Sequence, residues 1–428
     1  MAAAQYTESP IVPAPRSSFG PFSLDLSTRN IVRDGLDLRL RPQAFDALRV
    51  LLHKAGRFVS YEELIREAWG GNVVSRHTVA STIGAVRKAL NEYGSWIAYR
   101  PKLGYRLQVP ETEDLVRMAW HLWQRRTREG VERALSCFEQ AARMNPADPT
   151  PLDGITSCYL TLATFGMRPP EEVYELFREA QARAVALRGW TAKLRGERGR
   201  LLHTLERRLT EAENEFRLAQ QEQPTPVTVY INLAMLHASR KHLDQAMDVL
   251  AMARQLDPLH PTLPSTEIFV RFCRREFDEA VDCGKKGLDL HPYLHLGRAY
   301  YAQALEFSGR ADEALTQFRL ASVIAPDMLW LKALEARCLA NQGRSSEARR
   351  LLDELSEQRL SDYVDAYYMA LLYEALGERD NAIGELERIV EENSPTIYMM
   401  DVDPKMDSLR ADSRVAALRD ILFLNSNT

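Results

Sequence analysis

The sequence has no apolar run close to the ~18 residues that a membrane-spanning helix needs. Its first fifteen residues, MAAAQYTESPIVPAP, also lack the basic segment and the apolar segment of a secretory signal. We therefore expect a soluble, cytoplasmic chain without a membrane partner.

Cysteine is scarce and irregularly placed. There are five cysteines, an odd number without CxxC spacing, which argues against a disulfide framework or a zinc site. The spacing closest to that of metal ligands is His291 and His295, but Pro292 stands between them and no third ligand is evident. We expect no metal ion and no other cofactor.

Catalytic motifs are missing as well. The sequence contains no glycine-rich phosphate loop, no nucleophile elbow and no paired carboxylates, so we do not expect an enzyme. The 428 residues are too many for one ordinary core, which predicts several domains or a repeat array.

The charge is unevenly distributed. The whole chain has a net charge of −4, but residues 19–110 hold 14 Lys and Arg against 8 Asp and Glu. The remainder, from residue 111 onward, has a net charge of −10. A basic segment beside an acidic one is the distribution expected if only the first meets phosphates.

The basic segment predicts a small α+β domain. Residues 1–18 contain three prolines and are expected to be a flexible leader. Residues 19–40 alternate apolar and polar side chains and include the pair Asp34-Gly35, which predicts short antiparallel strands joined by a tight turn. A helix is predicted from Pro42 to near Gly56.

Two more helices and a hairpin follow. Ser60 and Glu63 have the spacing of a capping box before a helix over residues 61–69. In residues 75–92 one helical stripe is apolar, with Val79, Ile83, Val86 and Leu90, and the opposite side carries His77, Ser81, Ala85 and Lys88. Residues 96–100 and 105–109 predict the hairpin.

The segment 19–110 resembles the effector domains of OmpR/PhoB-type winged helix-turn-helix regulators. The resemblance lies in LRPQAFDALRVLLHKAGRFVSYEELIREAW, in VRKAL at the end of the third helix and in RPKLGYRL in the hairpin. It implies that the helix over residues 75–92 enters double-stranded DNA and that the hairpin forms the wing. The residues expected to contact DNA are Arg76, His77, Thr78, Ser81, Thr82, Ala85, Arg87, Lys88, Arg100, Lys102, Tyr105 and Arg106.

Two features depart from the best-known members of that family. No receiver domain precedes residue 19, so control by phosphorylation is not implied. Ser81 and Ala85 stand where family members often have bulkier or charged residues, so a preferred DNA sequence cannot be carried over. We expect modest specificity per subunit, increased when a homodimer or tandem pair binds repeated half-sites.

Alternatives remain for each part of this site. The helix could be a purely structural amphipathic helix, single basic residues could be solvated surface charges, and Tyr105 and Arg106 could serve to pack the hairpin. The resemblance implies that a loop meets RNA polymerase, although it could also be a plain connector. That loop consists of Gly70, Gly71, Asn72, Val73 and Val74.

Beyond residue 111 an alanine recurs every 34 residues, which is the tetratricopeptide period. The positions are Ala212, Ala246, Ala280, Ala314, Ala348 and Ala382, and prolines at 224, 258, 292 and 326 share the period. We expect about eight helical units over residues 111–395. Residues 396–428 are expected to form a terminal helix that seals the last apolar face, with a short tail.

The repeat template predicts a concave wall that is unusually apolar for an exposed surface. We expect it to receive an amphipathic peptide, a partner helix or a small apolar ligand, although several of its residues could instead be core. The residues on this predicted wall are Ile231, Met235, Phe269, Phe272, Trp330, Arg337, Tyr367 and Leu371.

The predicted fold class is mostly α, with an N-terminal α+β winged helix-turn-helix before an all-α tetratricopeptide superhelix. The two parts together resemble HilA-like and CadC-like regulators, and the lack of a membrane span favours the soluble, HilA-like arrangement. This resemblance implies a one-component bacterial transcription regulator that binds promoter DNA. The alternative is a tetratricopeptide interaction scaffold with a weak DNA-tethering domain.

Overall fold

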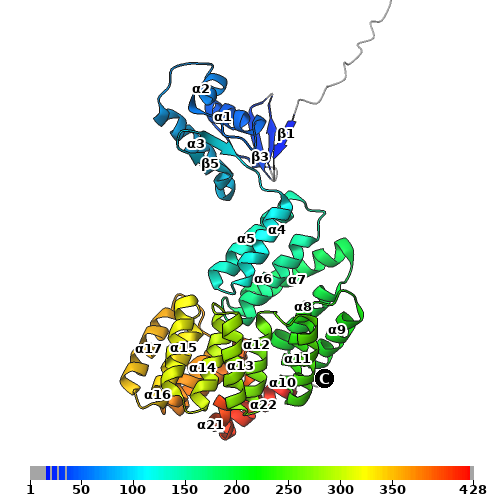
Figure 1. Cartoon of the computed structure of the whole chain (residues 1–428), viewed down its shortest axis with the longest axis vertical. Helices are drawn as coiled ribbons and strands as arrows, with labels where there is room; N and C mark the ends of the chain where they lie inside the picture. Colours follow the sequence, from blue (N-terminus) through cyan, green and yellow to red (C-terminus); the bar gives the residue numbers. More distant parts are fainter. Residues whose placement is uncertain (1–15, 20–21, 27, 34–35, 425–428) are drawn as a thin grey trace, which may run out of the picture. The chain divides into compact units, whose positions relative to one another are not determined.

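The computed structural model describes residues 16–19, 22–26, 28–33 and 36–424. It divides into an N-terminal unit, which extends to Leu115 and includes Arg143–Pro146, and a larger helical unit, which extends to the C-terminus (Figure 1). Most of the predicted leader and the predicted Asp34-Gly35 turn lie outside the described residues.

The N-terminal unit begins with an antiparallel sheet whose strands follow chain order. The strands are β1 (Arg16–Phe19), β2 (Phe22–Asp25), β3 (Asn30–Arg33) and β4 (Leu36–Asp37). In the register of β2 and β3, Leu24 lies opposite Ile31. Both side chains are fully buried, as is Phe22, so the period-two alternation gives the sheet one apolar face.

Three helices and a hairpin complete this unit. They are α1 (Pro42–His53), α2 (Tyr61–Ala68), α3 (Arg76–Leu90), the short η1 (Asn91–Trp96), and the hairpin strands β5 (Ile97–Arg100) and β6 (Gly104–Leu107). Ser60 is the N-cap of α2 as expected, because its Oγ accepts from Glu63 N at 3.1 Å, and Ser75 caps α3 in the same way, accepting from Thr78 N at 3.1 Å. The predicted helices and hairpin are therefore present.

The hairpin is attached to the segment that precedes α2. Val59 and Tyr105 exchange backbone hydrogen bonds of 2.7 and 3.0 Å. Gly104 has φ +98°, and a Cβ atom there would lie 2.0 Å from the carbonyl oxygen of Val59. Only glycine permits this approach, which explains the glycine at the start of β6.

The helical unit is built from successive antiparallel helix pairs, eight of them in the described part of the chain. The pairs are α4 (Thr112–Gln124) with α5 (Arg128–Met144), α6 (Thr150–Thr164) with α7 (Pro170–Arg188), α8 (Ala192–Leu201) and η2 (Leu202–Glu206) with α9 (Leu209–Gln221), α10 (Val227–Ser239) with α11 (Leu243–Leu256), α12 (Thr262–Cys273) with α13 (Phe277–Leu290), α14 (His295–Phe307) with α15 (Ala311–Ile324), α16 (Leu329–Asn341) with α17 (Ser345–Gln358), and α18 (Ala366–Ala375) with α19 (Arg379–Glu391). Among the described residues, no helix is both long and apolar enough to cross a membrane.

The 34-residue pattern marks two structural positions in each pair. The six predicted alanines are all fully buried, as expected where two helices approach closely. The turn between the two helices of a pair holds a residue with positive φ, and this position also repeats: Arg207, Lys241, Arg275, Gly309, Gly343 and Gly377. Arg126 and Gly166 occupy the corresponding turns of the first two pairs.

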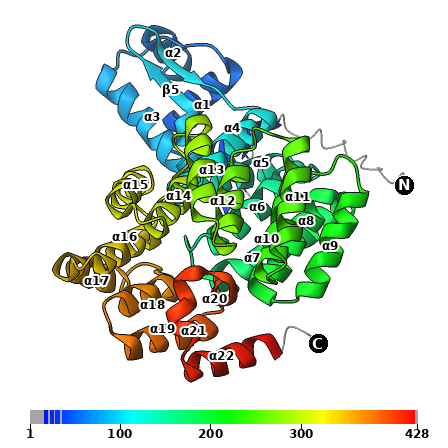
Figure 2. The ribbon, with the colours of Figure 1, turned by 60° about the horizontal axis from the view of Figure 1, so that its bottom comes forward.

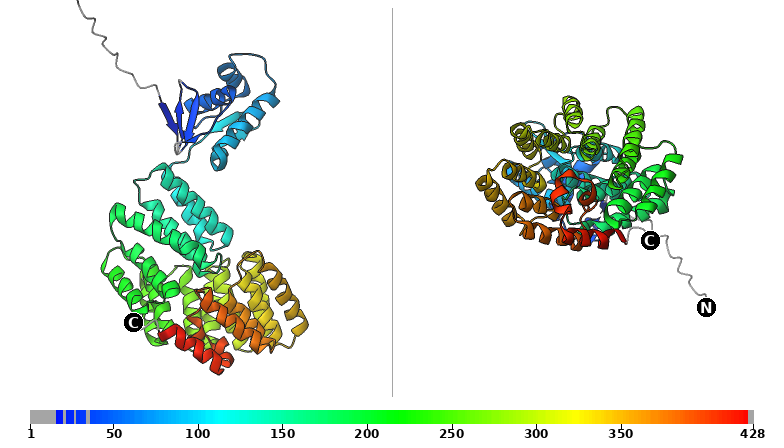
Figure 3. Two further views of the ribbon diagram at one scale, coloured as in Figure 1. Left: turned by 180° about the vertical axis from the view of Figure 1, so that it is seen from behind. Right: turned by 90° about the horizontal axis from the view of Figure 1, so that it is seen from below.

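The helical unit curves far enough for early and late pairs to touch. Arg128, at the start of α5, forms an ion pair with Asp362, which follows α17, with an N···O distance of 2.6 Å. Arg207 donates to the side chain of Asn393 after α19. The pairs therefore enclose an interior, which is seen end-on in the right view of Figure 3.

The C-terminal segment enters this interior. It contains α20 (Met399–Val402), η3 (Pro404–Met406), α21 (Asp407–Arg410) and α22 (Ser413–Leu424). Helix α22 packs against α19, as a capping helix would, but α20 contacts α10 (Figure 2). Asp403 accepts from Tyr367 of α18 at 2.7 Å, and Lys405 donates to Gln303 of α14. The C-terminal segment therefore packs against α19, as expected, and also contacts helices of earlier pairs inside the unit.

Candidate functional site

Helix α3 has one buried side and one open side. Val79, Ile83, Val86 and Leu90 are fully buried. The side chains of Arg76, His77, Ser81, Ala85 and Lys88 are exposed on the rest of the helix. The predicted apolar stripe is confirmed, and the open face has small, uncharged side chains at its centre.

The two threonines on α3 are engaged within the helix. Thr78 Oγ1 lies 2.9 Å from Ser75 Oγ, and Thr82 Oγ1 donates to the carbonyl of Thr78 at 2.9 Å. The Thr82 hydroxyl has a satisfied donor, so a DNA base edge would have to compete with the helix backbone for it. In the pair of Ser75 and Thr78 either hydroxyl can be the donor. Ser81 is the exposed hydroxyl without this restriction.

Several predicted basic residues rest on aromatic rings. The guanidinium of Arg76 lies 5.1 Å from the ring centre of Tyr61, and those of Arg100 and Arg106 lie 5.5 and 4.7 Å from that of Phe58. Cation–π contact orients a long side chain while leaving its donors available. Arg100 and Lys102 are exposed at the hairpin tip, and Lys102 has φ +68°.

Arg87 and Tyr105 have mainly internal contacts. Arg87 donates from Nε and Nη2 to the carbonyl of Ile97, at 3.1 and 2.6 Å, and so connects α3 to β5. Tyr105 is 4% exposed, and its ring packs against those of Tyr61 and Tyr99. These contacts favour the packing role that the sequence left open for Tyr105. They favour a structural role for Arg87 as well, which the sequence did not predict.

The loop between α2 and α3 projects an apolar side chain. Gly70 and Gly71 have φ of +62° and +82°, and no atom would obstruct a Cβ at either position. Asn72 is exposed, Val73 is fully exposed, and Val74 packs partly against the core of the unit. An isolated exposed valine on a loop is an available contact for another protein.

The predicted wall of the helical unit is only partly open. Seven of its eight residues have exposures of 6% or less, and only Met235 is half-buried. Five of the seven belong to the packed interior and do not line the cavity described next: Phe269, Phe272, Arg337, Tyr367 and Leu371. For these five residues the exposed wall was the wrong interpretation, and the alternative that several of the predicted wall residues are core holds. The C-terminal segment covers two of them, since the ammonium of Lys405 lies 5.0 Å from the ring centre of Phe272 and Asp403 binds the hydroxyl of Tyr367.

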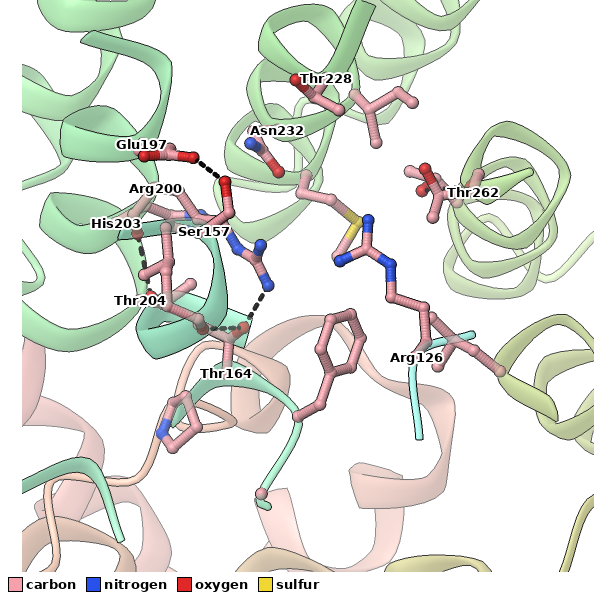
Figure 4. Close-up of a pocket in the computed structure, with 18 of the residues that line it drawn as sticks. Arg126, Ser157, Thr164, Glu197, Arg200, His203, Thr204, Thr228, Asn232 and Thr262 are labelled. Atoms are coloured by element: carbon pink, nitrogen blue, oxygen red, sulfur yellow. Dashed lines mark hydrogen bonds between the residues drawn. The ribbon is translucent and has the colours of Figure 1, made fainter. Parts of the chain in front are cut away.

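The other three predicted wall residues, Ile231, Met235 and Trp330, line a cavity of about 300 Å³. Figure 4 shows this cavity with several of its polar residues labelled. The first helix of every pair contributes to its wall, together with Pro395–Met399 of the C-terminal segment. The sequence did not predict the polar residues around it. Most of the charged ones belong to the first and third pairs, where the 34-residue template does not fix the inner positions, whereas Asp365 is the N-cap of α18 in the eighth pair. The most prominent of them are Arg126, Lys193, Glu197, Arg200 and Asp365.

The charges of this cavity are unequally matched. Lys193 pairs with Glu197. Burial raises the pKa of Asp365 to about 6, although Ser394 and Thr396 donate to its carboxylate. Burial also lowers the pKa of His203 to about 3, so this imidazole is neutral near pH 7.

Comparisons with known proteins assign both parts of the chain. Residues 35–107 match the family model "Transcriptional regulatory protein, C terminal", and residues 366–394 match a "Tetratricopeptide repeat" model. Transcriptional activator CadC of Escherichia coli (strain K12) is 34% identical over 95 residues, which are 21% of this chain and 19% of CadC. Transcriptional regulatory protein CutR of Streptomyces coelicolor is 35% identical over 85 residues, 20% of this chain and 39% of CutR. The match thus spans well under half of either relative.

Among solved structures, the human IFIT1 dimer with m7Gppp-AAAA aligns with 78% of this chain and 82% of its own, with a TM-score of 0.51 and 15% identity. At this identity the similarity concerns the fold alone. The chain joins an OmpR/PhoB-type winged helix-turn-helix domain to a tetratricopeptide repeat superhelix, and its first part is shared with bacterial transcription regulators.

Proposed function

We propose that this protein is a one-component bacterial transcription regulator, and not an enzyme. Helix α3 and the β5–β6 wing bind promoter DNA, and the repeat region receives a signal or a partner. The observation that carries the proposal is the α3 surface, which is fully buried along one stripe and open along the other within a unit of net positive charge.

In this proposal α3 enters the major groove with Ser81 and Ala85 at its centre. A serine hydroxyl and an alanine methyl can read base edges and thymine methyls, but neither makes the bidentate contact of an arginine with guanine. Arg76, Lys88 and the wing contact phosphates, which fix position rather than sequence. Two subunits on adjacent half-sites then supply the missing specificity, so a homodimer on DNA is part of the proposal.

The wing assignment is tested by replacing Arg100 and Lys102 together with alanine in the full chain. Fluorescence anisotropy with DNA fragments selected by genome-wide mapping should show weaker binding and a salt slope smaller by about 2, one for each lost phosphate contact. Arg49→Ala is the control, because Arg49 is a partly exposed arginine on α1 that lies 3.6 Å from Asp46 and outside the wing. If the double variant kept the affinity and the salt slope of the wild type, the assignment of the β5–β6 hairpin as a DNA-contacting wing would be refuted. Binding by the wild type without sequence preference would favour the scaffold alternative.

The loop between α2 and α3 is proposed to contact RNA polymerase. Val73→Ser should reduce transcription from a target promoter in a reconstituted assay while leaving DNA affinity unchanged, because the side chain contacts nothing within its own unit. Leu36→Ser, another largely exposed apolar residue in the same unit, serves as the control. Equal loss of transcription and DNA binding by the Val73 variant would count against the contact.

A further inference from the structure

Two arginines point into the cavity of the helical unit, as Figure 4 shows. Arg126 lies in the turn after α4, where its guanidinium stacks 3.4 Å from the ring centre of Trp123 and Nη1 donates to Thr161 Oγ1 at 3.3 Å. Arg200, on α8, donates to Thr164 Oγ1. Each guanidinium carries five N–H donors, and these bonds use few of them.

Neither arginine has an ion pair with a carboxylate in the described part of the chain. Arg337 provides an internal comparison. It is buried to a similar extent, with 6% exposure against 8% for Arg126, but it donates to both carboxylate oxygens of Glu306 at 2.9 and 2.8 Å. Elsewhere in the same unit, therefore, a buried arginine is matched by an acid.

Burial and mutual repulsion make the arrangement unfavourable for the empty protein. Burial lowers the pKa of Arg126 to about 9, and the positive charge of Arg200 lowers it as well. Burial lowers the pKa of Arg200 to about 10. Two like charges that share a poorly solvated space favour the entry of a negative charge.

The acids that face the cavity are already engaged. Glu197 accepts hydrogen bonds from Thr156, Ser157 and Lys193. Asp365 accepts from the backbone N–H of Tyr367 and from two hydroxyls of the C-terminal segment. Glu197 is near enough for its charge to raise the pKa of Arg200, against the larger effect of burial. Neither acid forms an ion pair with either arginine in the described part of the chain, so both guanidinium groups lack a direct counter-charge.

The rest of the wall is largely aromatic, with hydroxyl and amide groups among the rings. Its rings are those of Trp120, Trp123, Phe165, Tyr300, Trp330, Tyr368 and Tyr398. Thr228 and Asn232 of α10 and Thr262 and Thr266 of α12 supply uncharged hydrogen-bonding groups. A volume of about 300 Å³ is at the small end of ligand sites and excludes a partner helix.

We propose that this cavity binds a small organic anion with a planar ring system. Arg126 and Arg200 hold its carboxylate, sulfonate or phosphate group, because guanidinium groups bind such oxyanions through charge-assisted hydrogen bonds. The rings of the wall stack on its planar part. That this anion is the signal of the regulator rests on the proposed function. Its binding to the cavity does not, since binding requires no DNA.

The test uses two fluorescent probes with the full chain in native buffer. Anilinonaphthalene sulfonate carries the required anionic group, and phenylnaphthylamine has the same rings without it. The wild type should bind one equivalent of the sulfonate at least about tenfold more tightly than the neutral probe. Arg126→Gln and Arg200→Gln should each weaken sulfonate binding about tenfold or more while leaving binding of the neutral probe unchanged.

Arg183→Gln, an exposed arginine on α7, is the matched control and should change neither affinity. Equal affinity of the wild type for the two probes would overturn the proposal. So would sulfonate binding that survives both substitutions.

Thermal unfolding without probe separates binding from folding. Because each substitution removes an unpaired charge from the interior, both variants should melt no lower than Arg183→Gln. A lower melting temperature for both would show that the arginines serve the fold and would also overturn the proposal. If the wild type failed to bind DNA but kept its preference for the sulfonate, the regulator function would be refuted and the ligand site would stand.

Discussion

Arg87 and Lys88 are neighbours on α3 with different surroundings. Lys88 is exposed, whereas Arg87 is half-buried and donates twice to the carbonyl of Ile97. The sequence predicted both as DNA contacts, because residue type and spacing do not reveal which way a long side chain turns. The small residues were more predictable: Val79, Ile83 and the repeat alanines have few conformations, and their burial follows from helical period alone.

Replacing Arg87 with methionine should destabilise the N-terminal unit by about 1–3 kcal/mol, since a buried carbonyl loses its charged donor. DNA affinity should fall with no change in salt slope, whereas Lys88→Met should reduce the slope by about 1. Thermal unfolding and salt-dependent anisotropy measure the two effects. A smaller slope for the Arg87 variant would instead identify Arg87 as a phosphate contact.

Among the elements, α1 and α2 are joined by a cluster of charges. Lys54, just after α1, contacts Glu63 at 2.6 Å and also Glu67, and Arg57 approaches Glu63 as well. Hydrogen bonds from Lys54 and then from Arg57 lower the pKa of Glu63 to about 2. Glu63 was predicted as half of a capping box, and its N–H does bind Ser60 Oγ, but its carboxylate serves this cluster.

Because the pKa of Glu63 is lower in the folded state than in the unfolded chain, its contribution to stability is present above pH 4.5 and is lost as the pH falls toward 2. Since Arg57 and Glu67 keep the outer part of this cluster in contact with solvent, we expect a loss of only about 1 kcal/mol. Glu63→Gln should lower the protection of the α1 and α2 amides from hydrogen exchange at pH 6. It should also remove most of the loss of stability between pH 4.5 and 2. Amide hydrogen exchange of α1 and α2, measured in the full chain in mild urea and corrected for intrinsic rates, reports their stability at each pH. If their stability fell as steeply with acid in the variant as in the wild type, Glu63 would be excluded as the source of the acid dependence.

The repeat elements show where prediction from a period ends. The 34-residue spacing identifies which side of each first helix faces inward, and Ile231, Met235 and Trp330 do line a cavity. It carries no information about a non-repeating segment that fills the same space. Phe272 and Tyr367 were therefore placed correctly on the inner side and wrongly described as open.

At the scale of the whole molecule, the C-terminal segment connects helix pairs that are distant in sequence. Asp403, which is fully buried, accepts from Tyr367 of α18 and from Lys405, whose ammonium also donates to Gln303 of α14. Burial lowers the pKa of Lys405, so this charge depends on its partner. The segment thus stabilises the curvature of the helical unit.

Asp403→Asn should destabilise the helical unit by about 3–5 kcal/mol, because a buried ammonium loses its counter-charge. Adding Lys405→Met should restore part of the loss. Asp380→Asn, on the exposed side of α19, is the control. Calorimetry of the full chain gives the comparison. An Asp403 variant that melts like the control would show that the segment is not held by this charge pair.

The ion pair between Arg128 and Asp362 also bears on how the helical unit comes apart. In an open array each repeat touches only its neighbours, so unfolding can start at an end and spread one repeat at a time. Here the first and seventh pairs hold each other, and the early end of the array is not free to fray. The helical unit is thereby driven toward cooperative unfolding, in which all pairs are lost together.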